Sequence, residues 1–258
     1  DYLCATTGKP ISMCGCEGHS HHTTLIAELK NRDPRLLQTV PTPEAGEYTY
    51  YLEGKRPDIG KYTSGSVSTS TGYGVIKYYN PSEYTSSHHI GTLDAPIFRY
   101  AEILLNAAEA LNEAGKTDQA YQYVNQVRAR VGMPAYAGMT QGTFRERIRN
   151  ERRIELCFED HRFFDERRWM LFSDQTASSE ISLPRYKQVY NIYSVVVTPK
   201  EGTVYTYKND NTHPTRSFNI PKNYLFPVPD ETFKKAPSLG QNSGWELTSA
   251  AGEKGKNK

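Results

Sequence analysis

The stretch of residues 96–115 constrains the fold more than any other part of this chain. Its apolar residues recur at steps of three and four, which places them on one face of an α-helix, and Gly115 follows as an end signal. A second helix is expected over residues 117–131, with Gly132 and Pro134 ending it. The two apolar faces comprise Ile97, Tyr100, Ala101, Leu104, Leu105, Ala108 and Leu111, and then Ala120, Val124 and Val127.

This helix pair has the spacing of a tetratricopeptide repeat, a unit of two helices joined by a turn. The matching positions are Leu104, Ala107, Ala108, Leu111, Ala120 and Val124, with Pro134 shortly after the second helix. About three neighbouring repeats are needed to bury such faces, and one is recognisable here. We therefore expect the partner repeats to lie upstream of Asp1.

A third helix is expected to begin after Thr143. The sequence T-F-R-E sets Thr143 as the N-cap and Glu146 as its partner in a capping box. The helix should run to about Leu156, and the charged sequence beyond allows it to reach Trp169. The middle of the chain is therefore predicted to be helical.

The rest of the chain is rich in turn-forming residues. Residues 1–92 are expected to form long loops with a few short strands and one helical piece at 24–29. Residues 186–208 are rich in Tyr and Val and predict a β-hairpin that turns at 199–202. The tail at 249–258 is small, polar and charged, which predicts disorder.

Charge and motif content exclude several functions. Thirty-one Lys and Arg against 29 Asp and Glu leave a net charge of +2, too small to attract a nucleic acid. No stretch approaches the roughly 18 apolar residues of a membrane-spanning helix. The sequence contains no nucleotide-binding loop, no H-E-x-x-H motif and no G-x-S-x-G motif. We therefore expect a binding protein with no catalytic residues and no cofactor.

Four segments, in this order, resemble the SusD/RagB family of nutrient-binding lipoproteins. They are NRDPRL at 31–36, PIFRYAEILLNAAEALNEAG at 96–115, IRNERRIELCFEDHRFFDERRW at 148–169 and NYLFPVPDETFKKAPSLGQNSGW at 223–245. The two middle segments are long and specific. This sequence departs from the family pattern at Asp160, where a Gly usually follows the Glu, and at Glu166, where a Leu is usual.

The resemblance implies a mainly α, SusD-like fold of tetratricopeptide-like helical repeats with long loops and small β elements, in one structural domain. Residues 1–92 would be its loop-rich, ligand-facing part, residues 93–248 its helical part and residues 249–258 a disordered tail. Members of the family are roughly twice this long and begin with a lipidated Cys. The N-terminal half is therefore expected to be missing here.

The resemblance also implies a cellular location and partners. The protein would sit on the outer membrane at the cell surface, attached through the lipid of the missing N-terminus. It would capture an oligosaccharide or polysaccharide and pass this glycan to a TonB-dependent, SusC-like transporter. The identity of the glycan is left open.

Tyrosines in the loop-rich part are the predicted ligand-binding residues. The chain has 19 Tyr residues, many of them among Gly, Ser, Thr, Asn and Pro, where a ring is expected to be partly exposed. Flat rings cover the apolar faces of sugars, and the resemblance places part of the ligand site in the same region. The residues predicted to bind glycan are Tyr48, Tyr50, Tyr73, Tyr78, Tyr79, Tyr84 and His88.

Three other functions stay open at this point. A peptide carrier, as in the RagB branch of the family, would have acidic or basic pocket walls without stacked rings. A protein-interaction adaptor with no small ligand would bury the tyrosines. A glycoside hydrolase would need two carboxylates across a cleft and measurable turnover.

The charged third helix has a structural interpretation. Glu151, Glu155 and Glu159 are spaced four residues apart on one helix face, a pattern that acid–base chemistry or a metal site could use. However, eight Arg and seven acidic residues lie between Arg145 and Arg168, so almost every acid has a basic neighbour three or four residues away. A structural role is therefore predicted for Arg99, Glu102, Glu151, Arg152, Glu155, Arg162, Asp165 and Arg168.

Cysteine and histidine residues are clustered near the start of the chain. The spacing C-x-C-x2-H-x-H-H contains residue types that bind zinc, but it is not the spacing of a zinc finger. No metal site is therefore expected, and the residues kept as candidates are Cys14, Cys16, His19 and His21. A disulfide between Cys4 and either Cys14 or Cys16 is an equal alternative on an oxidising cell surface.

Overall fold

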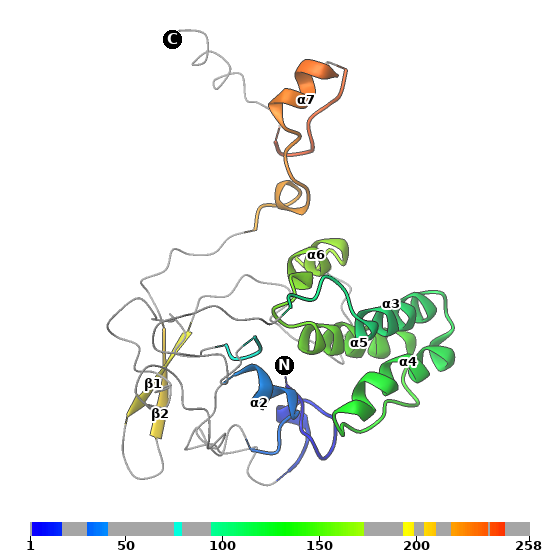
Figure 1. Cartoon of the computed structure of the whole chain (residues 1–258), viewed down its shortest axis with the longest axis vertical. Coiled ribbons are helices and arrows are strands. Elements are labelled where there is room, and N and C mark those ends of the chain that lie inside the picture. The colour runs from blue at the N-terminus through cyan, green and yellow to red at the C-terminus, as the bar shows by residue number, and fades with distance from the viewer. Residues whose placement is uncertain are drawn as a thin grey trace. The chain divides into compact units, whose positions relative to one another are not determined.

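The computed structural model describes residues 2–16, 30–40, 75–78, 94–172, 193–198, 204–209, 218–236 and 238–245 (Figure 1). The chain divides into two compact units, one formed by residues 1–162 and 191–214 and the other by residues 163–190 and 215–258. The expectation of one structural domain stays a prediction. The predicted helical piece at 24–29 and the predicted tail at 249–258 lie outside the described residues.

Within the described residues, the first unit is mainly helical, as predicted, and contains one two-stranded sheet. Its elements are η1 (Ile11–Met13), α2 (Arg35–Thr39), α3 (Tyr100–Glu113), α4 (Thr117–Arg130), α5 (Gln141–Glu155), β1 (Tyr193–Thr198) and β2 (Val204–Asn209). β1 and β2 pair antiparallel with Thr198 opposite Val204, which confirms the predicted hairpin. None of the described helices is long and apolar enough to cross a membrane.

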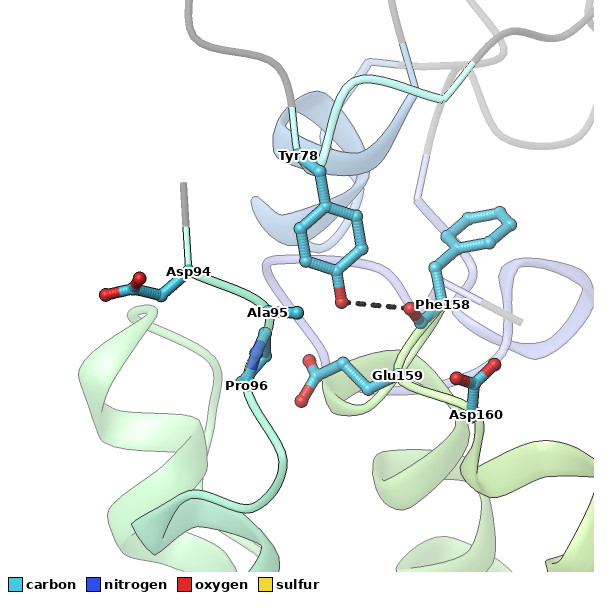
Figure 2. A pocket seen from close by; sticks show the side chains of 7 residues that line it. All are labelled: Tyr78, Asp94, Ala95, Pro96, Phe158, Glu159 and Asp160. Atoms are coloured by element: carbon cyan, nitrogen blue, oxygen red, sulfur yellow. Dashed lines mark hydrogen bonds between the residues drawn. The ribbon is translucent and has the colours of Figure 1, made fainter. Parts of the chain in front are cut away.

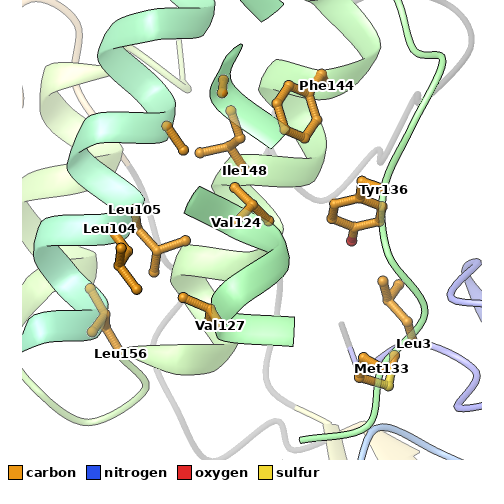
Figure 3. Packing of buried hydrophobic residues seen from close by; sticks show 12 residues of the cluster. Leu3, Leu104, Leu105, Val124, Val127, Met133, Tyr136, Phe144, Ile148 and Leu156 are labelled. Carbon is orange, nitrogen blue, oxygen red and sulfur yellow. The ribbon is translucent and has the colours of Figure 1, made fainter. Parts of the chain in front are cut away.

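Helices α3, α4 and α5 pack around one hydrophobic core (Figure 3). Leu105, Val124 and Phe144 contribute one fully buried side chain from each helix. The centroid of the Phe144 ring lies 4.4 Å from that of Tyr121 and 6.1 Å from that of Tyr136. Each buried apolar side chain of this size stabilises the fold by about 1.5–3 kcal/mol, and ring contacts add to that. Eight of the ten residues that predicted the helix pair lie in this core or pack against it. Ile97 and Tyr100 do not, because Ile97 precedes α3 and Tyr100 is its first residue, and the two are 89% and 70% exposed.

The predicted N-cap of α5 is wrong. Thr140 is the N-cap instead, and its hydroxyl accepts a hydrogen bond from the backbone N–H of Thr143 at 3.2 Å. The side chain of Gln141 donates to the backbone oxygen of Asn112 at 2.6 Å, and Asn112 Nδ2 donates to the backbone oxygen of Gln141 at 3.0 Å. These two reciprocal hydrogen bonds join the first turn of α5 to the end of α3. Helix α5 therefore starts earlier than its local capping pattern indicates.

Helix α5 ends at Glu155 and does not reach Trp169. Phe158 and Asp160 in the turn that follows have φ angles of 62° and 60°, in the left-handed region. Such a φ costs most non-glycine residues about 1–2 kcal/mol, Asp somewhat less, and Gly nothing. Asp160 therefore adopts a backbone conformation that Gly, the residue expected from the resemblance at this position, would adopt more readily. The turn separates α5 from the next helix, α6 (His161–Arg168), which continues into the second unit.

The second unit also contains η5 (Lys222–Tyr224) and α7 (Asp230–Lys235). The ring centroids of Phe172 and Phe218 lie 4.0 Å apart in a stacked arrangement. Trp245 Nε1 donates to the backbone oxygens of Lys222, at 2.8 Å, and Leu225, at 3.0 Å. A tryptophan from the end of the described chain therefore fixes the η5 turn.

Candidate functional site

A pocket of about 390 Å³ opens on the first unit (Figure 2). Its lining residues are Tyr78, Asp94, Ala95, Pro96, Phe158, Glu159 and Asp160. Two of these residues carry aromatic rings, and Tyr78 is 43% exposed and Phe158 53% exposed. Three of them carry carboxylates. The pocket therefore combines apolar ring surface with hydrogen-bond acceptors.

The Tyr78 side chain is fixed by its hydroxyl, which donates to the backbone oxygen of Phe158 at 2.9 Å (Figure 2). Burial, followed by the nearby Glu159 carboxylate, raises the pKa of Tyr78, so the hydroxyl remains a donor at neutral pH. Because the ring is already held, ligand binding would cost little additional side-chain entropy.

Lys77 fastens the same segment to the C-terminal end of α5. Its ammonium group donates to the backbone oxygens of Glu155 at 3.1 Å and Cys157 at 2.7 Å. It also lies 2.5 Å from Oε1 of Glu159. A cation is favourable at a helix C-terminus, where backbone oxygens lack partners. Lys77 and Tyr78 thereby hold a short segment against a turn 80 positions later in the chain.

The side chains of Glu155 and Glu159 are covered and paired with arginines. Arg99 Nη1 lies 2.6 Å from Glu155 Oε1, and Arg99 Nε lies 2.7 Å from Glu159 Oε2. Arg130 Nη2 lies 2.8 Å from Glu155 Oε1. The two glutamate side chains are only 1% and 3% exposed, so these charge-assisted bonds act in a weakly screened environment. They position the pocket carboxylate of Glu159.

The ion-pair network continues through Arg35, which is in the NRDPRL segment. Arg35 donates two bonds to Asp33, at 2.9 and 2.6 Å, and one to Glu155 at 2.8 Å. Its Nη1 also lies 2.7 Å from Glu151 Oε1, outside hydrogen-bond alignment, so that attraction is coulombic. The other oxygen of Glu151 accepts from Arg128 Nη1 at 2.8 Å. The network therefore joins the 33–35 segment to α4 and α5.

Stability should fall in acid because of Glu155 and Glu159. Burial alone would raise the pKa of Glu155, but bonds from Arg99 and Arg35 lower it, and bonds from Arg99 and Lys77 lower the pKa of Glu159 in the same way. A carboxyl group whose pKa is lower in the folded state than in the unfolded state stabilises the fold. This stabilisation is fully present above the unfolded-state pKa of about 4.3 and is lost as the pH falls through the folded-state pKa. Urea unfolding should show this decline below about pH 4.3, and Glu159→Gln should make it shallower. An equally steep decline in the variant would contradict this assignment.

The structure places the residues with a predicted structural role as follows. Arg99, Glu151 and Glu155 belong to the ion-pair network. Arg152 is buried and donates to Asn106 Oδ1 at 2.5 Å. Glu102 lies 3.9 Å from Arg152 and 3.6 Å from His161. Arg162 is half-buried on α6. Asp165 is buried and pairs with Arg168 at 2.9 Å. Their structural role stays a prediction that substitution can test.

One of the predicted glycan-binding residues, Tyr78, lines the pocket. The other six, which lie outside the described residues, are Tyr48, Tyr50, Tyr73, Tyr79, Tyr84 and His88. Their ligand contact stays a prediction. The metal candidates His19 and His21 are also outside the described residues, whereas Cys14 and Cys16 are inside them.

Sequence reasoning missed most of the pocket lining. Asp94, Pro96 and Phe158 carried no signal, because each is an ordinary residue in its own segment and the three meet only through the fold. Asp160 did carry a signal, since it replaces an expected Gly at a left-handed position. A side chain kept at a position that favours Gly is a reason to inspect that turn.

The fold and the pocket define a helical, tetratricopeptide-like scaffold with an open pocket of aromatic and acidic residues. A model of the SusD family matches residues 6–245, and the chain belongs to this family. SusD-like protein P2 of Formosa agariphila is 34% identical over 152 residues, which are 52% of this chain and 27% of that protein. SusD-like protein P25 of the same organism is 41% identical over 86 residues, 30% of this chain and 16% of that protein.

Solved structures of this family have the same fold. A SusD-like protein from Bacteroides fragilis is 28% identical, with a TM-score of 0.64, and the match covers 84% of this chain and 40% of that chain. A SusD-like carbohydrate-binding protein from the same species is 26% identical, with a TM-score of 0.53, over 82% of this chain and 42% of that chain. The chain therefore spans less than half the length of the relatives that it matches.

Proposed function

We propose that this chain is part of a cell-surface protein that binds a neutral oligosaccharide or polysaccharide in the pocket. The observation that carries the proposal is the pairing of the exposed Tyr78 and Phe158 rings with the Asp94 and Asp160 carboxylates. Rings cover the apolar faces of sugars, and carboxylates accept hydrogen bonds from hydroxyl groups. The carbohydrate-binding relative from Bacteroides fragilis supports the same ligand class.

The pocket chemistry sets the expected affinity and ligand charge. A ring that covers about 80 Å² of apolar sugar surface contributes about 2 kcal/mol before ordering costs. Two rings and a few hydrogen bonds correspond to dissociation constants of about millimolar to micromolar, which suits capture followed by release. The charge of Glu159 is balanced by Arg99 and Lys77, but Asp94 and Asp160 would repel a sulfated or uronic-acid glycan. A neutral glycan is therefore the favoured ligand.

Glu159 is a poor candidate for the proton donor of a glycosidase. A glycosidase that works through two carboxyl groups needs one with a raised pKa to protonate the leaving group. Arg99 and Lys77 outweigh the effect of burial and lower the pKa of Glu159, which makes this pocket carboxylate a poor proton donor. By family membership, we also propose that the protein is lipid-anchored in the outer membrane and delivers its ligand to a TonB-dependent, SusC-like transporter.

The test is affinity electrophoresis of the intact protein in gels that contain neutral or acidic polysaccharides, with peptide binding and reducing-sugar release measured on the same sample. Retardation by a neutral glycan without sugar release is the expected result. Retention of peptide alone would favour the peptide carrier, and sugar release would favour the hydrolase. Retardation only by acidic glycans would overturn the assignment of a neutral ligand.

Replacing Tyr78 should weaken glycan binding. Tyr78→Ala removes one stacking ring, and we expect about a tenfold loss of affinity, equivalent to about 1.4 kcal/mol. Tyr78→Phe keeps the ring but removes its bond to Phe158, so it should lose only the part of the affinity that comes from holding the ring in place. Tyr100→Ala is a matched control, because Tyr100 is 70% exposed and does not line the pocket. Isothermal titration with the retained glycan measures all three variants, and equal effects of Tyr78→Ala and Tyr100→Ala would argue against this site.

A further inference from the structure

Three cysteine thiols converge at the start of the first unit. The Sγ atoms of Cys4, Cys14 and Cys16 all lie within 4.8 Å of one another, and those of Cys4 and Cys16 are 3.6 Å apart. Two thiolates on one zinc ion, at about 2.3 Å each and near the tetrahedral angle, would be about 3.8 Å apart. The observed spacing is therefore close to that of two thiolates on one metal ion.

The backbone holds the three thiols in place. Cys4 is fully buried and forms a β-bridge with Arg32. The 3-10 turn η1 delivers Cys14, whose thiol lies 3.3 Å from the backbone oxygen of Ile11. Gly15, which lies between Cys14 and Cys16, has a φ of 68°. Gly adopts this conformation readily, and it reverses the direction of the chain. The site is thus built from two segments rather than from one flexible loop.

Polar groups surround the sulfur atoms as they do in metal–thiolate sites. The backbone N–H of Cys16 donates to Cys14 Sγ at 3.4 Å, and Asn31 Nδ2 donates to Cys4 Sγ at 3.8 Å. Hydrogen bonds of this kind orient metal-bound ligands and stabilise the charge of a thiolate. Asn31 itself has a φ of 53°, so the chain adopts an uncommon conformation at the residue that reaches this sulfur.

We propose that Cys4, Cys14 and Cys16 bind one thiophilic divalent metal ion of the zinc class, at a site independent of the glycan pocket. All three ligands are sulfur, which selects such ions over magnesium or calcium. One ion uses all three thiols, whereas a disulfide would use two and leave the third. A water molecule or another ligand would take the fourth position. The C-x-C-x2-H spacing did not reveal this set, because Cys4 joins it only in the folded chain.

The first experiment uses the unmodified protein. The intact protein, purified under reducing conditions, is freed of metal and then alkylated with iodoacetamide with and without one equivalent of zinc. Zinc should protect the Cys4, Cys14 and Cys16 thiols and leave the alkylation of Cys157 unchanged. The proposal would be overturned if zinc changed the alkylation of none of the four cysteines. So would a disulfide between Cys4 and Cys14 or Cys16 in freshly isolated protein that persists when zinc is supplied during expression.

The second experiment measures affinity. Zinc competition with a chromophoric chelator should give one ion per chain, and cobalt substitution should give sulfur-to-metal charge-transfer absorption. Cys16→Ser should weaken zinc binding about 100-fold or more, and Asn31→Ala about tenfold. Cys157→Ser is the matched control and should bind as the unmodified protein does. Zinc affinity that is the same in Cys16→Ser and Cys157→Ser would reject the site.

Discussion

Replacing Arg35 by Met should destabilise the intact protein by about 3–5 kcal/mol, the usual cost of removing one partner from a buried ion pair. The Arg35 side chain is 6% exposed, and that of Asp33 is fully buried. In the variant, Glu151 keeps Arg128, and Glu155 keeps Arg99 and Arg130. Asp33 loses both side-chain bonds and retains the one from the backbone N–H of Arg35. The cost should therefore arise mainly from the uncompensated charge of Asp33.

A second substitution tests that explanation. Adding Asp33→Asn to Arg35→Met removes the uncompensated charge, so the double variant should be more stable than the sum of the two single effects predicts. Lys234→Met is the control, because its i,i+3 pair with Glu231 on α7 is well exposed and should contribute under about 1 kcal/mol. Urea unfolding measures all four variants. A loss below about 1 kcal/mol in Arg35→Met would mean that the network contributes little to stability.

The helical part of the fold was predictable because its signals are local. The apolar residues of α3 and α4 recur at helical spacing, and Gly115 and Gly132 mark the ends of these helices with positive φ angles of 76° and 70°. The start of α5 was not predictable in the same way. Its first turn depends on the exchange between Gln141 and Asn112, which are 29 positions apart.

The pocket was less predictable because it is assembled from three separate segments. Tyr78 was one of several tyrosines with similar local sequence, and nothing near it indicated a bond to Phe158, 80 positions away. The charged pattern of α5 predicted ion pairs with neighbours on the same helix. Glu146 does pair with Arg149 on the same helix, but Glu151 and Glu155 pair with arginines from other segments, namely Arg35, Arg99 and Arg128. Sequence spacing identified the charged residues but not their partners.

Replacing Lys77 by Met should reduce both stability and glycan affinity. Lys77 donates to the backbone oxygens of Glu155 and Cys157 and pairs with Glu159, so three charge-assisted interactions are lost together. Bonds to a charged group contribute about 1.5–3 kcal/mol each, but Glu159 keeps Arg99. The expected loss of stability is therefore about 2–3 kcal/mol. Urea unfolding measures it, with Lys116→Met as the control, because Lys116 is an exposed lysine in the turn between α3 and α4.

The effect on binding separates positioning from stability. Lys77 does not line the pocket, but it fixes the segment that carries Tyr78, and without it the Tyr78 ring must be ordered when the ligand binds. We therefore expect Lys77→Met to lose about tenfold in glycan affinity at a temperature where it is fully folded. Combining it with Tyr78→Ala should add little further loss, because both changes act through the same ring. Fully additive losses would show that Lys77 acts on the ligand by another route. An unchanged affinity in Lys77→Met would show that the Tyr78–Phe158 bond holds the ring even when Lys77 is absent.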